Sequence, residues 1–240
     1  MDIKQGDPIG MAILEYIQSP SDEEIIVSSD LCDDDVIPVK LLFRSLEEMP
    51  DIEQKALALC KGDVLEVGAG AGVHALELIK KGHNITAIDI SNGAVQYLKK
   101  LGINSEQINF FDFKSKKFDT ILLLMNGIGI SKNLETLPLF LEHAKTLLNP
   151  NGQIICDSTD VSYIYEDEED SIWVNLNASY QGDFKFKMKY KDDETEWFEW
   201  LYVDFDNLEK AAEKTGFRAK KAIEEEDRYL AVLTLIDQKK

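Results

Sequence analysis

Basic residues are scarce in this 240-residue sequence, because 26 lysines and arginines stand against 45 aspartates and glutamates and the formal net charge is −19. A surface that binds nucleic acid needs clustered Lys and Arg to neutralise phosphates. The longest basic cluster is the short stretch 114–117, which has the composition of a solvated turn. The charge therefore argues against a nucleic-acid partner.

Cysteine and histidine are also rare, with three of each. The cysteines are odd in number and show no Cys-x-x-Cys spacing, so they do not indicate a disulfide framework or a zinc site. The histidines lack the His-Glu-x-x-His and His-x-x-x-His spacings of metal-binding helices. We therefore expect no metal.

Long hydrophobic runs are missing as well. No apolar stretch approaches the roughly 20 residues of a membrane span, and the N-terminus lacks the basic start and apolar core of a signal peptide. We expect no membrane partner and a cytoplasmic location. Disorder of the whole chain is excluded, because 44% of the residues are hydrophobic and the length is sufficient for a buried core.

Strand and helix patterns alternate through the middle of the chain. Apolar runs predict strands over residues 64–67, 85–88, 108–111 and 119–125 and from residue 154, and helical spacing predicts helices over 73–81, 93–100 and 134–148. This alternation implies right-handed β-α-β units and a parallel sheet, with ligands at the carboxyl ends of the strands.

The two ends of the chain show different patterns. Helical spacing over 9–17, over 39–46 and from 52 predicts N-terminal helices, and we find no strand pattern there strong enough to form a sheet by itself. Alternating residues over 184–190 and 197–203 predict a β-hairpin, followed by a helix over 206–214 and a final strand over 229–236. We predict an α/β fold, with a Rossmann-like, seven-stranded, mostly parallel sheet, helices on both faces, N-terminal helices and an inserted β-hairpin.

The glycine-rich stretch 66–72 follows a strand pattern and opens an amphipathic helix. Glycines let the backbone turn sharply and let a ligand lie directly on the main chain. The next strand pattern ends in Asp89, at a spacing that suits a carboxylate bonded to the ribose hydroxyls of an adenosine cofactor. A tight turn without a ligand, with Asp89 as an ordinary strand-end cap, is the structural alternative.

The position of the third glycine helps to decide which adenosine-containing cofactor the loop could bind. A dinucleotide fingerprint, Gly-x-Gly-x-x-Gly, requires glycine at position 73, where the sequence has Val73, and the third glycine comes one residue early at Gly72. A P-loop is excluded because no Gly-Lys-Ser/Thr follows.

Taken together, these motifs resemble those of the class I S-adenosylmethionine-dependent methyltransferases. The resemblance rests on Glu66-x-Gly68-x-Gly70-x-Gly72, Asp89, the stretches 111–113 and 118–122, the Asn-Pro-Asn-Gly turn at 149–152 and the stretch 215–217, and it covers roughly residues 52–157 and 204–237. It implies S-adenosyl-L-methionine as the cofactor and S-adenosyl-L-homocysteine as the product. We accordingly divide the chain into an N-terminal helical lid segment, residues 1–51, and a methyltransferase domain, residues 52–240, with 158–203 as an inserted acidic loop and hairpin.

The resemblance also implies a set of cofactor-binding residues. The three glycines line the methionine and ribose part, Glu66 lies beneath their loop, Asp89 takes the ribose hydroxyls, and Asp112 with Phe113 holds the adenine. The neighbouring candidates are His74, Ile90 and Asn126. We add the hypothesis that Arg44 pairs with the methionine carboxylate in bidentate geometry, with a salt bridge to Glu47 or Glu48 as the alternative.

The acceptor side is less defined. Residues 125–129 follow the fourth strand, where the acceptor site of the family begins, but they lack its Asn/Asp-Pro-Pro-aromatic motif, and the chain has no Pro-Cys. Both absences favour a small-molecule acceptor, and acidic clusters at 22–24, 33–35 and 166–170 favour a cationic or amine one, with solvated loops as the alternative. Candidate polar groups on this side are Asn126, His143, Asp160, Tyr163, Tyr165 and Tyr202, of which Asn126 and Tyr165 are the catalytic candidates.

Two other functions are compatible with the sequence. A non-catalytic S-adenosylmethionine-binding or partner protein would explain clear cofactor motifs beside unclear acceptor motifs. An NAD(P)-dependent oxidoreductase would require a dinucleotide fingerprint, which the misplaced third glycine disfavours. The sequence leaves monomer and homodimer equally open.

Overall fold

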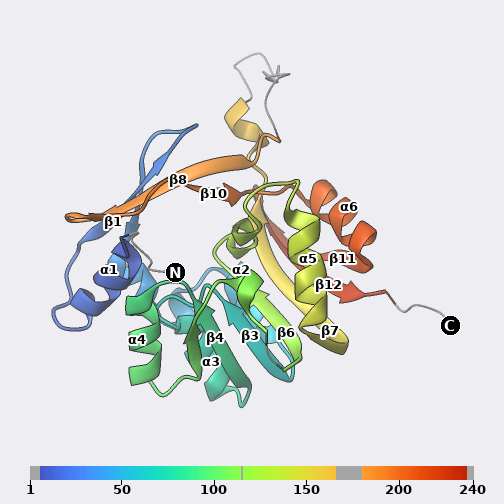
Figure 1. Ribbon diagram of the computed structural model, residues 1–240, viewed down its shortest axis with the longest axis horizontal. Coiled ribbons are helices and arrows are strands. Elements are labelled where there is room, and N and C mark those ends of the chain that lie inside the picture. The colour runs from blue at the N-terminus through green and yellow to red at the C-terminus, as the bar shows by residue number, and fades with distance from the viewer. Residues whose placement is uncertain (1–5, 115, 166–179, 237–240) are drawn as a thin grey trace.

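A seven-stranded sheet forms the centre of the computed structural model, which describes residues 6–114, 116–165 and 180–236 (Figure 1). The strand order is β11-β12-β7-β6-β3-β4-β5. The strands are β3 (Asp63–Val67), β4 (Asn84–Asp89), β5 (Ser105–Gln107), β6 (Phe118–Leu123), β7 (Leu148–Thr159), β11 (Phe217–Glu225) and β12 (Arg228–Leu235). Strands β5, β4, β3, β6 and β7 are parallel, and β12 runs antiparallel to both of its neighbours. The predicted seven-stranded, mostly parallel sheet is confirmed.

Helices cover both faces of this sheet, as the alternating helical patterns predicted. They are α2 (Asp51–Leu59), α3 (Val73–Lys80), α4 (Asn92–Lys100), α5 (Leu137–Thr146) and α6 (Phe205–Thr215). A further helix, α1 (Pro8–Tyr16), packs on α4 rather than on the sheet. Short 3-10 helices are η1 (Val39–Phe43), η2 (Leu46–Glu48), η3 (Phe110–Asp112), η4 (Gly127–Ser131) and η5 (Ser162–Tyr165). A side chain caps the start of α4, where the Ser91 hydroxyl accepts from Ala94 N–H, and backbone geometry ends α6, where Gly216 adopts the left-handed conformation with φ 82°.

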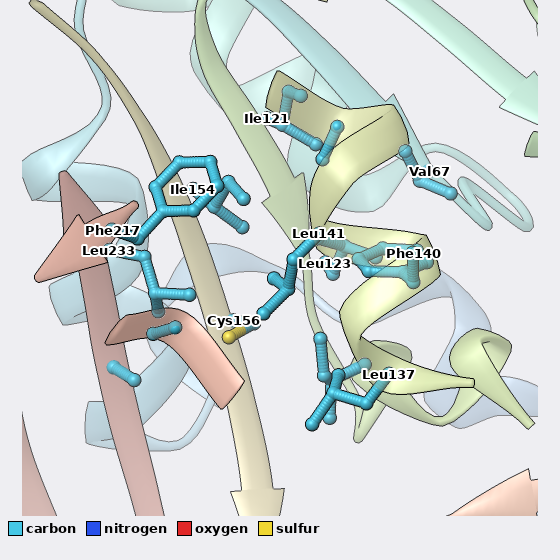
Figure 2. Close-up of a cluster of buried hydrophobic side chains, with 14 of the residues drawn as sticks. Val67, Ile121, Leu123, Leu137, Phe140, Leu141, Ile154, Cys156, Phe217 and Leu233 are labelled. Atoms are coloured by element: carbon cyan, nitrogen blue, oxygen red, sulfur yellow. The ribbon is translucent and has the colours of Figure 1, made fainter. Parts of the chain in front are cut away.

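Two hydrophobic cores lie on the opposite faces of the sheet, because successive side chains of a strand point to opposite sides. In β6, Ile121 and Leu123 face the core beneath α5 and α6, whereas Leu122 faces the core beneath α2 and α3. Figure 2 shows part of the first core, where Phe140 and Leu141 of α5 lie over the strands. Burial on both faces is the reason β6 has a nearly continuous apolar sequence.

A second, antiparallel sheet lies across one end of the main sheet, with β8 as its longest strand (Figure 1). Its order is β10-β8-β1-β2, and the short β9 also pairs with β8. The bounds are β1 (Glu24–Ser29), β2 (Asp35–Pro38), β8 (Asp183–Tyr190), β9 (Asp193–Glu194) and β10 (Phe198–Leu201). The predicted hairpin is present as β8 and β10, which pair Phe186 with Phe198.

The N-terminal segment differs from its predicted helical structure. Residues 24–38 contain the strands β1 and β2, and the predicted helix over 39–46 consists of the 3-10 helices η1 and η2. Strand β1 pairs with β8, about 160 residues further along the chain, at Ile26–Lys189. A pairing so distant in sequence leaves no local pattern, which explains the difference. The predicted third strand over 108–111 is displaced to β5, and η3 occupies the second half of the predicted range.

Candidate functional site

The glycine loop connects the carboxyl end of β3 to the first turn of α3. Gly68, Gly70 and Gly72 all have positive φ, at 73°, 53° and 77°. A Cβ on Gly72 would lie 2.5 Å from Leu98 Cδ2, so this glycine lets α4 pack closely against the loop. A Cβ on Gly70 would meet nothing within 4 Å. A side chain at position 72 would therefore have to displace Leu98, whereas Gly70 keeps open space beside the backbone.

Asp89 is brought to this loop from the end of the adjacent strand β4. Its Oδ2 accepts a hydrogen bond from Gly70 N–H at 2.8 Å, and its Oδ1 accepts one from Ser91 N–H at 2.8 Å. Burial raises the pKa of the Asp89 carboxyl, the two backbone hydrogen bonds oppose that rise, and the nearby Asp7 carboxylate adds to it. Asp89 thus caps its own strand end and also holds the glycine loop, and its contact with ribose hydroxyls stays a prediction.

Beneath the loop, four ionisable side chains form one buried chain of contacts, which we call the buried charge chain: Arg44, Glu53, His74 and Glu66. Arg44 donates through an Nη to Glu53 Oε2, which also lies 3.0 Å from His74 Nε2. His74 Nδ1 lies 3.3 Å from Glu66 Oε1. All four residues are at most 6% exposed. The chain joins the N-terminal segment to the strand and helix on either side of the glycine loop.

The contacts within the buried charge chain favour the ionised forms of His74 and Glu53. Burial opposes the positive charge of His74, but the hydrogen bonds to Glu53 and Glu66 outweigh it and raise the His74 pKa to about 9. Burial likewise opposes ionisation of Glu53, and the contacts with His74 and Arg44 outweigh it, so the Glu53 pKa is lowered. The two central groups of the chain therefore carry opposite charges near neutral pH.

Arg44 does not form the salt bridge to Glu47 or Glu48 that the sequence left open. Its ion pair is with Glu53, and its other Nη donates to Leu41 O at 2.5 Å. Glu48 instead accepts from Ser45 N–H at 2.7 Å and closes the first turn of η2. The Nε of Arg44 is buried and has no hydrogen-bond partner in the described part of the chain. The hypothesis that Arg44 pairs with the methionine carboxylate of the cofactor stays a prediction.

The predicted adenine residues lie beyond the loop, after β4 and β5. Ile90 is 64% exposed directly after Asp89, and Asp112 is exposed at the end of η3. Phe113 is 2% exposed and packs against Phe118, with 6.3 Å between ring centroids, so its ring belongs to the core. Asp112 and Ile90 therefore have side chains available to a ligand, whereas Phe113 can offer its backbone.

Asn126 follows β6 with φ 56° and links it to β7. Its N–H donates to Asp157 Oδ1 at 2.9 Å, and its Oδ1 accepts from the Thr159 hydroxyl at 2.9 Å. Asp157 is fully buried and 3.1 Å from an Nη of Arg228. Burial raises the Asp157 pKa to about 6, although Arg228 favours the charged form. The side chain of Tyr165, the other catalytic candidate, lies outside the described residues.

Sequence reasoning missed two of these functional candidates, Glu53 and Asp157. Glu53 sits in a helix of otherwise ordinary amphipathic pattern, where a glutamate is typical of the solvent face. Asp157 carried a usable signal, because it comes directly after the apolar part of the fifth predicted strand, as Asp89 does after the second. Carboxylates at the carboxyl ends of parallel strands meet at one edge of a sheet.

One face of the second sheet carries five aromatic side chains, which we call the aromatic face: Phe184, Phe186, Phe198, Trp200 and Tyr202. Phe184 stacks on Phe186 with ring centroids 5.5 Å apart, and Phe198 lies 6.4 Å from Phe186 and 6.1 Å from Trp200. Tyr202 lies 5.3 Å from Phe184 and 6.0 Å from Phe186. Phe184 is buried, but the other four rings keep partial solvent access.

The aromatic face lies at the carboxyl end of the main sheet. Trp200 packs on η4, directly after β6, because a Cβ on Gly129 would lie 2.1 Å from Trp200 Nε1. Burial raises the Tyr202 pKa to about 12, and the carboxylates of Asp35 and Asp157 add to the rise. Aromatic rings and acidic groups therefore meet at the same edge of the sheet as the glycine loop.

Comparisons with known proteins show which family this chain resembles over most of its length. The family model of the methyltransferase domain matches residues 40–221. An S-adenosylmethionine-dependent methyltransferase from Bacteroides fragilis, solved in complex with S-adenosyl-L-homocysteine, is 42% identical, with a TM-score of 0.90 over 97% of this chain and 96% of that chain.

More distant structures share the fold alone. The CcbJ methyltransferase from Streptomyces caelestis has a TM-score of 0.58 at 13% identity, over 80% of this chain and 95% of that one. An S-adenosylmethionine-dependent methyltransferase from Clostridium acetobutylicum has a TM-score of 0.56 at 14% identity, over 82% and 96%. No curated protein of known function matches the sequence.

The chain therefore belongs to the methyltransferase domain family. The resemblance to class I S-adenosylmethionine-dependent methyltransferases is confirmed, and S-adenosylmethionine is the cofactor of this family. Within the described residues, no cluster of His, Cys, Asp and Glu could hold a metal ion. Over the same part of the chain, no helix is long and apolar enough to cross a membrane.

Proposed function

We propose that this protein transfers a methyl group from S-adenosylmethionine to an amine of a small molecule. The observation that carries the proposal is the shared edge of the sheet, where the glycine loop with Asp89 lies near an acidic aromatic face. The binding site for the adenosine cofactor and the binding site for the amine would then lie side by side. Transfer of a group between two bound molecules requires such an arrangement. The protein's location in the cytoplasm stays a prediction.

The residues present fit the cofactor. Gly70 leaves open space beside the backbone, Asp89 offers carboxylate lone pairs to ribose hydroxyls, and the Oε2 of Glu66 is buried without a partner in the described chain. We assign the ribose to Asp89 and the glycines, and the adenine to Ile90, Asp112 and the backbone of Phe113. The charged amino acid end is assigned to Arg44 and Glu66.

The bound cofactor supplies a methyl group on a sulfonium, whose leaving group is a neutral thioether. The protein's main contribution is then to position the acceptor atom in line and exclude water, so few catalytic side chains are needed. Asn126 is suitably placed to orient an acceptor, because its backbone and Oδ1 are fixed by Asp157 and Thr159 while its amide nitrogen is free of such a bond among the described residues.

An amine acceptor follows from the chemistry of the aromatic face. Ring faces attract ammonium groups by about 0.5–2 kcal/mol, and carboxylates add a Coulombic term. An amine bound in this form releases one proton to solvent before its lone pair attacks the methyl carbon and the C–S bond breaks. Tyr202 sits between these two kinds of group, with aromatic neighbours on its own sheet and Asp35 and Asp157 close enough to raise its pKa. An acceptor with a carboxylate or phosphate would meet repulsion from Asp35, whereas the charge of Asp157 is paired with Arg228.

The cofactor assignment is tested by calorimetry with S-adenosylmethionine and NADH. We expect binding of the sulfonium cofactor and none of NADH, and the reverse result would contradict the methyltransferase assignment. Production of S-adenosylhomocysteine from a metabolite extract then separates an enzyme from a binding protein, because a non-catalytic protein binds without turnover.

The acceptor class is tested with matched small molecules that differ only in carrying an amine, a phenol or a carboxylate. We expect turnover with the amine series, and turnover confined to the carboxylates would overturn the proposal. Asp35→Asn should raise the KM for the amine several-fold. Asp34→Asn removes the same charge from the neighbouring exposed position and serves as the control, with no change expected.

A further inference from the structure

The buried charge chain has an unusual arrangement at its two ends. Arg44 ends it with a buried Nε that donates to no atom in the described chain, and Glu66 ends it with a buried Oε2 that accepts from none. The two end groups are opposite in charge. Glu53 and His74 connect them: Glu53 Oε2 contacts both Arg44 and His74, and both ring nitrogens of His74 contact carboxylates of the chain.

A purely structural role does not account for this arrangement. Buried ion pairs are on average no more stabilising than apolar side chains of similar size. Each unsatisfied buried polar atom costs about 1–3 kcal/mol more. A donor at one end and an acceptor at the other are instead what a ligand with both a carboxylate and an ammonium group would complete.

Glu53 and His74 hold the side chains at the two ends of the buried charge chain in place. Glu53 Oε2 contacts Arg44 and His74 at once, which fixes the plane of the guanidinium relative to the imidazole. His74 holds Glu66 Oε1, which leaves Oε2 as the free oxygen. Without the charge of Glu53, two buried cations would face Glu66 alone. Without the charge of His74, two buried carboxylates would share a single guanidinium.

We propose that Glu53 and His74 are positioning residues that orient Arg44 and Glu66 for the charged amino acid end of the cofactor. This inference rests on the proposed function, because it assumes that the cofactor lies over the glycine loop. Neither residue needs to touch the cofactor. Their contribution is confined to ligands that carry the amino acid group.

The test compares two ligands by calorimetry. S-adenosylmethionine has the amino acid end, whereas 5′-methylthioadenosine shares the adenosine and the sulfur but lacks that end. We expect Glu53→Gln and His74→Gln each to weaken S-adenosylmethionine binding by about 10- to 100-fold, the range expected for hydrogen bonds to charged groups. Binding of 5′-methylthioadenosine should change by less than about three-fold, since the adenosine contacts are retained.

Two further variants control for charge and folding. Glu77→Gln removes a carboxylate from the same helix α3 outside the buried charge chain, where the partly buried Glu77 pairs with Lys80, and it should leave both affinities unchanged. Glu53→Asp keeps the charge with a shorter reach, so partial recovery relative to Glu53→Gln is expected. If Glu53→Gln does not fold, the affinities of Glu53→Asp for the two ligands are compared with those of the wild type instead, because a charged replacement retains the pairing with Arg44 and His74.

The outcomes separate this inference from the proposed function. Failure of the wild-type protein to bind S-adenosylmethionine would refute the function itself. Wild-type binding combined with a parallel loss for both ligands would show that Glu53 and His74 only support the fold. Wild-type binding with no loss for either ligand would show that Arg44 and Glu66 need no positioning, and either result would overturn the inference.

Discussion

Alanine at Gly72 is expected to destabilise the protein mainly through packing. A non-glycine residue at φ 77° costs about 1–2 kcal/mol, because its Cβ approaches the following carbonyl oxygen. The new Cβ would also lie 2.5 Å from Leu98 Cδ2, and overpacking of that kind costs about 1–3 kcal/mol. We therefore expect Gly72→Ala to lower the free energy of unfolding by about 2–5 kcal/mol.

Alanine at Gly70 is the matched comparison, because it has a positive φ of 53° and open space where the Cβ would lie. Only the cost of placing a non-glycine residue at positive φ applies here, so we expect the free energy of unfolding to fall by about 1–2 kcal/mol. The Cβ would occupy the space that we assign to the cofactor, and S-adenosylmethionine affinity should therefore fall by about 10-fold or more.

Thermal unfolding followed by circular dichroism, together with calorimetric titration of the cofactor, measures both effects. In a chain of this length each kcal/mol corresponds to about 2–4 °C in Tm, so Gly72→Ala should melt about 4–20 °C below wild type and Gly70→Ala about 2–8 °C below it. The reasoning is refuted if Gly70→Ala is the less stable of the two, or if it binds the cofactor as tightly as wild type.

Three further predictions concern single side chains. Asp89→Asn places an amide where the two backbone N–H donors of Gly70 and Ser91 point, so we expect at least about 10-fold weaker cofactor binding by calorimetry, and unchanged affinity would contradict the assigned ribose contact. The folded-state pKa of His74 is raised from 6.5 to about 9, so its stabilisation is complete below about 6.5 and is lost as the pH rises through about 9. Urea midpoints should fall over that window in the wild type and much less in His74→Gln, and equal slopes would exclude a protonated His74. Leu141→Ala creates a cavity in the core beneath α5, where Leu141 is fully buried, and should cost about 2–5 kcal/mol by the same urea assay. A loss of unfolding free energy below about 1 kcal/mol would show that the surrounding side chains relax and fill the cavity.

Much of the fold was predictable because its patterns are local. The parallel strands β3, β4 and β6 are short apolar runs bounded by glycine or aspartate, and the helices between them have amphipathic spacing and recognisable ends. The β1–β2 hairpin was missed because its pairing with β8 joins residues about 160 positions apart. Only the assembled second sheet provides the partner strand that stabilises the acidic sequence around β1.

The site was predictable to the same extent. Glycines at Gly68, Gly70 and Gly72 and a carboxylate at Asp89 leave a direct sequence signal, because turn geometry and strand ends restrict the residue type. Glu53 left no such signal, since a glutamate in an amphipathic helix is ordinarily solvated. Its burial against Arg44 and His74 follows from the packing of α2 beneath the glycine loop.

By itself, the sequence determined the parallel sheet, the glycine loop, its acidic partner and the family. These features depend on backbone geometry and hydrophobic periodicity over a few residues at a time. Only the tertiary structure decided that the N-terminal segment adds strands to a second sheet, that aromatic rings gather at the carboxyl end of the main sheet, and that Arg44 pairs with Glu53. The physical reason is that strand pairing, burial and ion pairing depend on contacts between residues far apart in the chain, which no local pattern records.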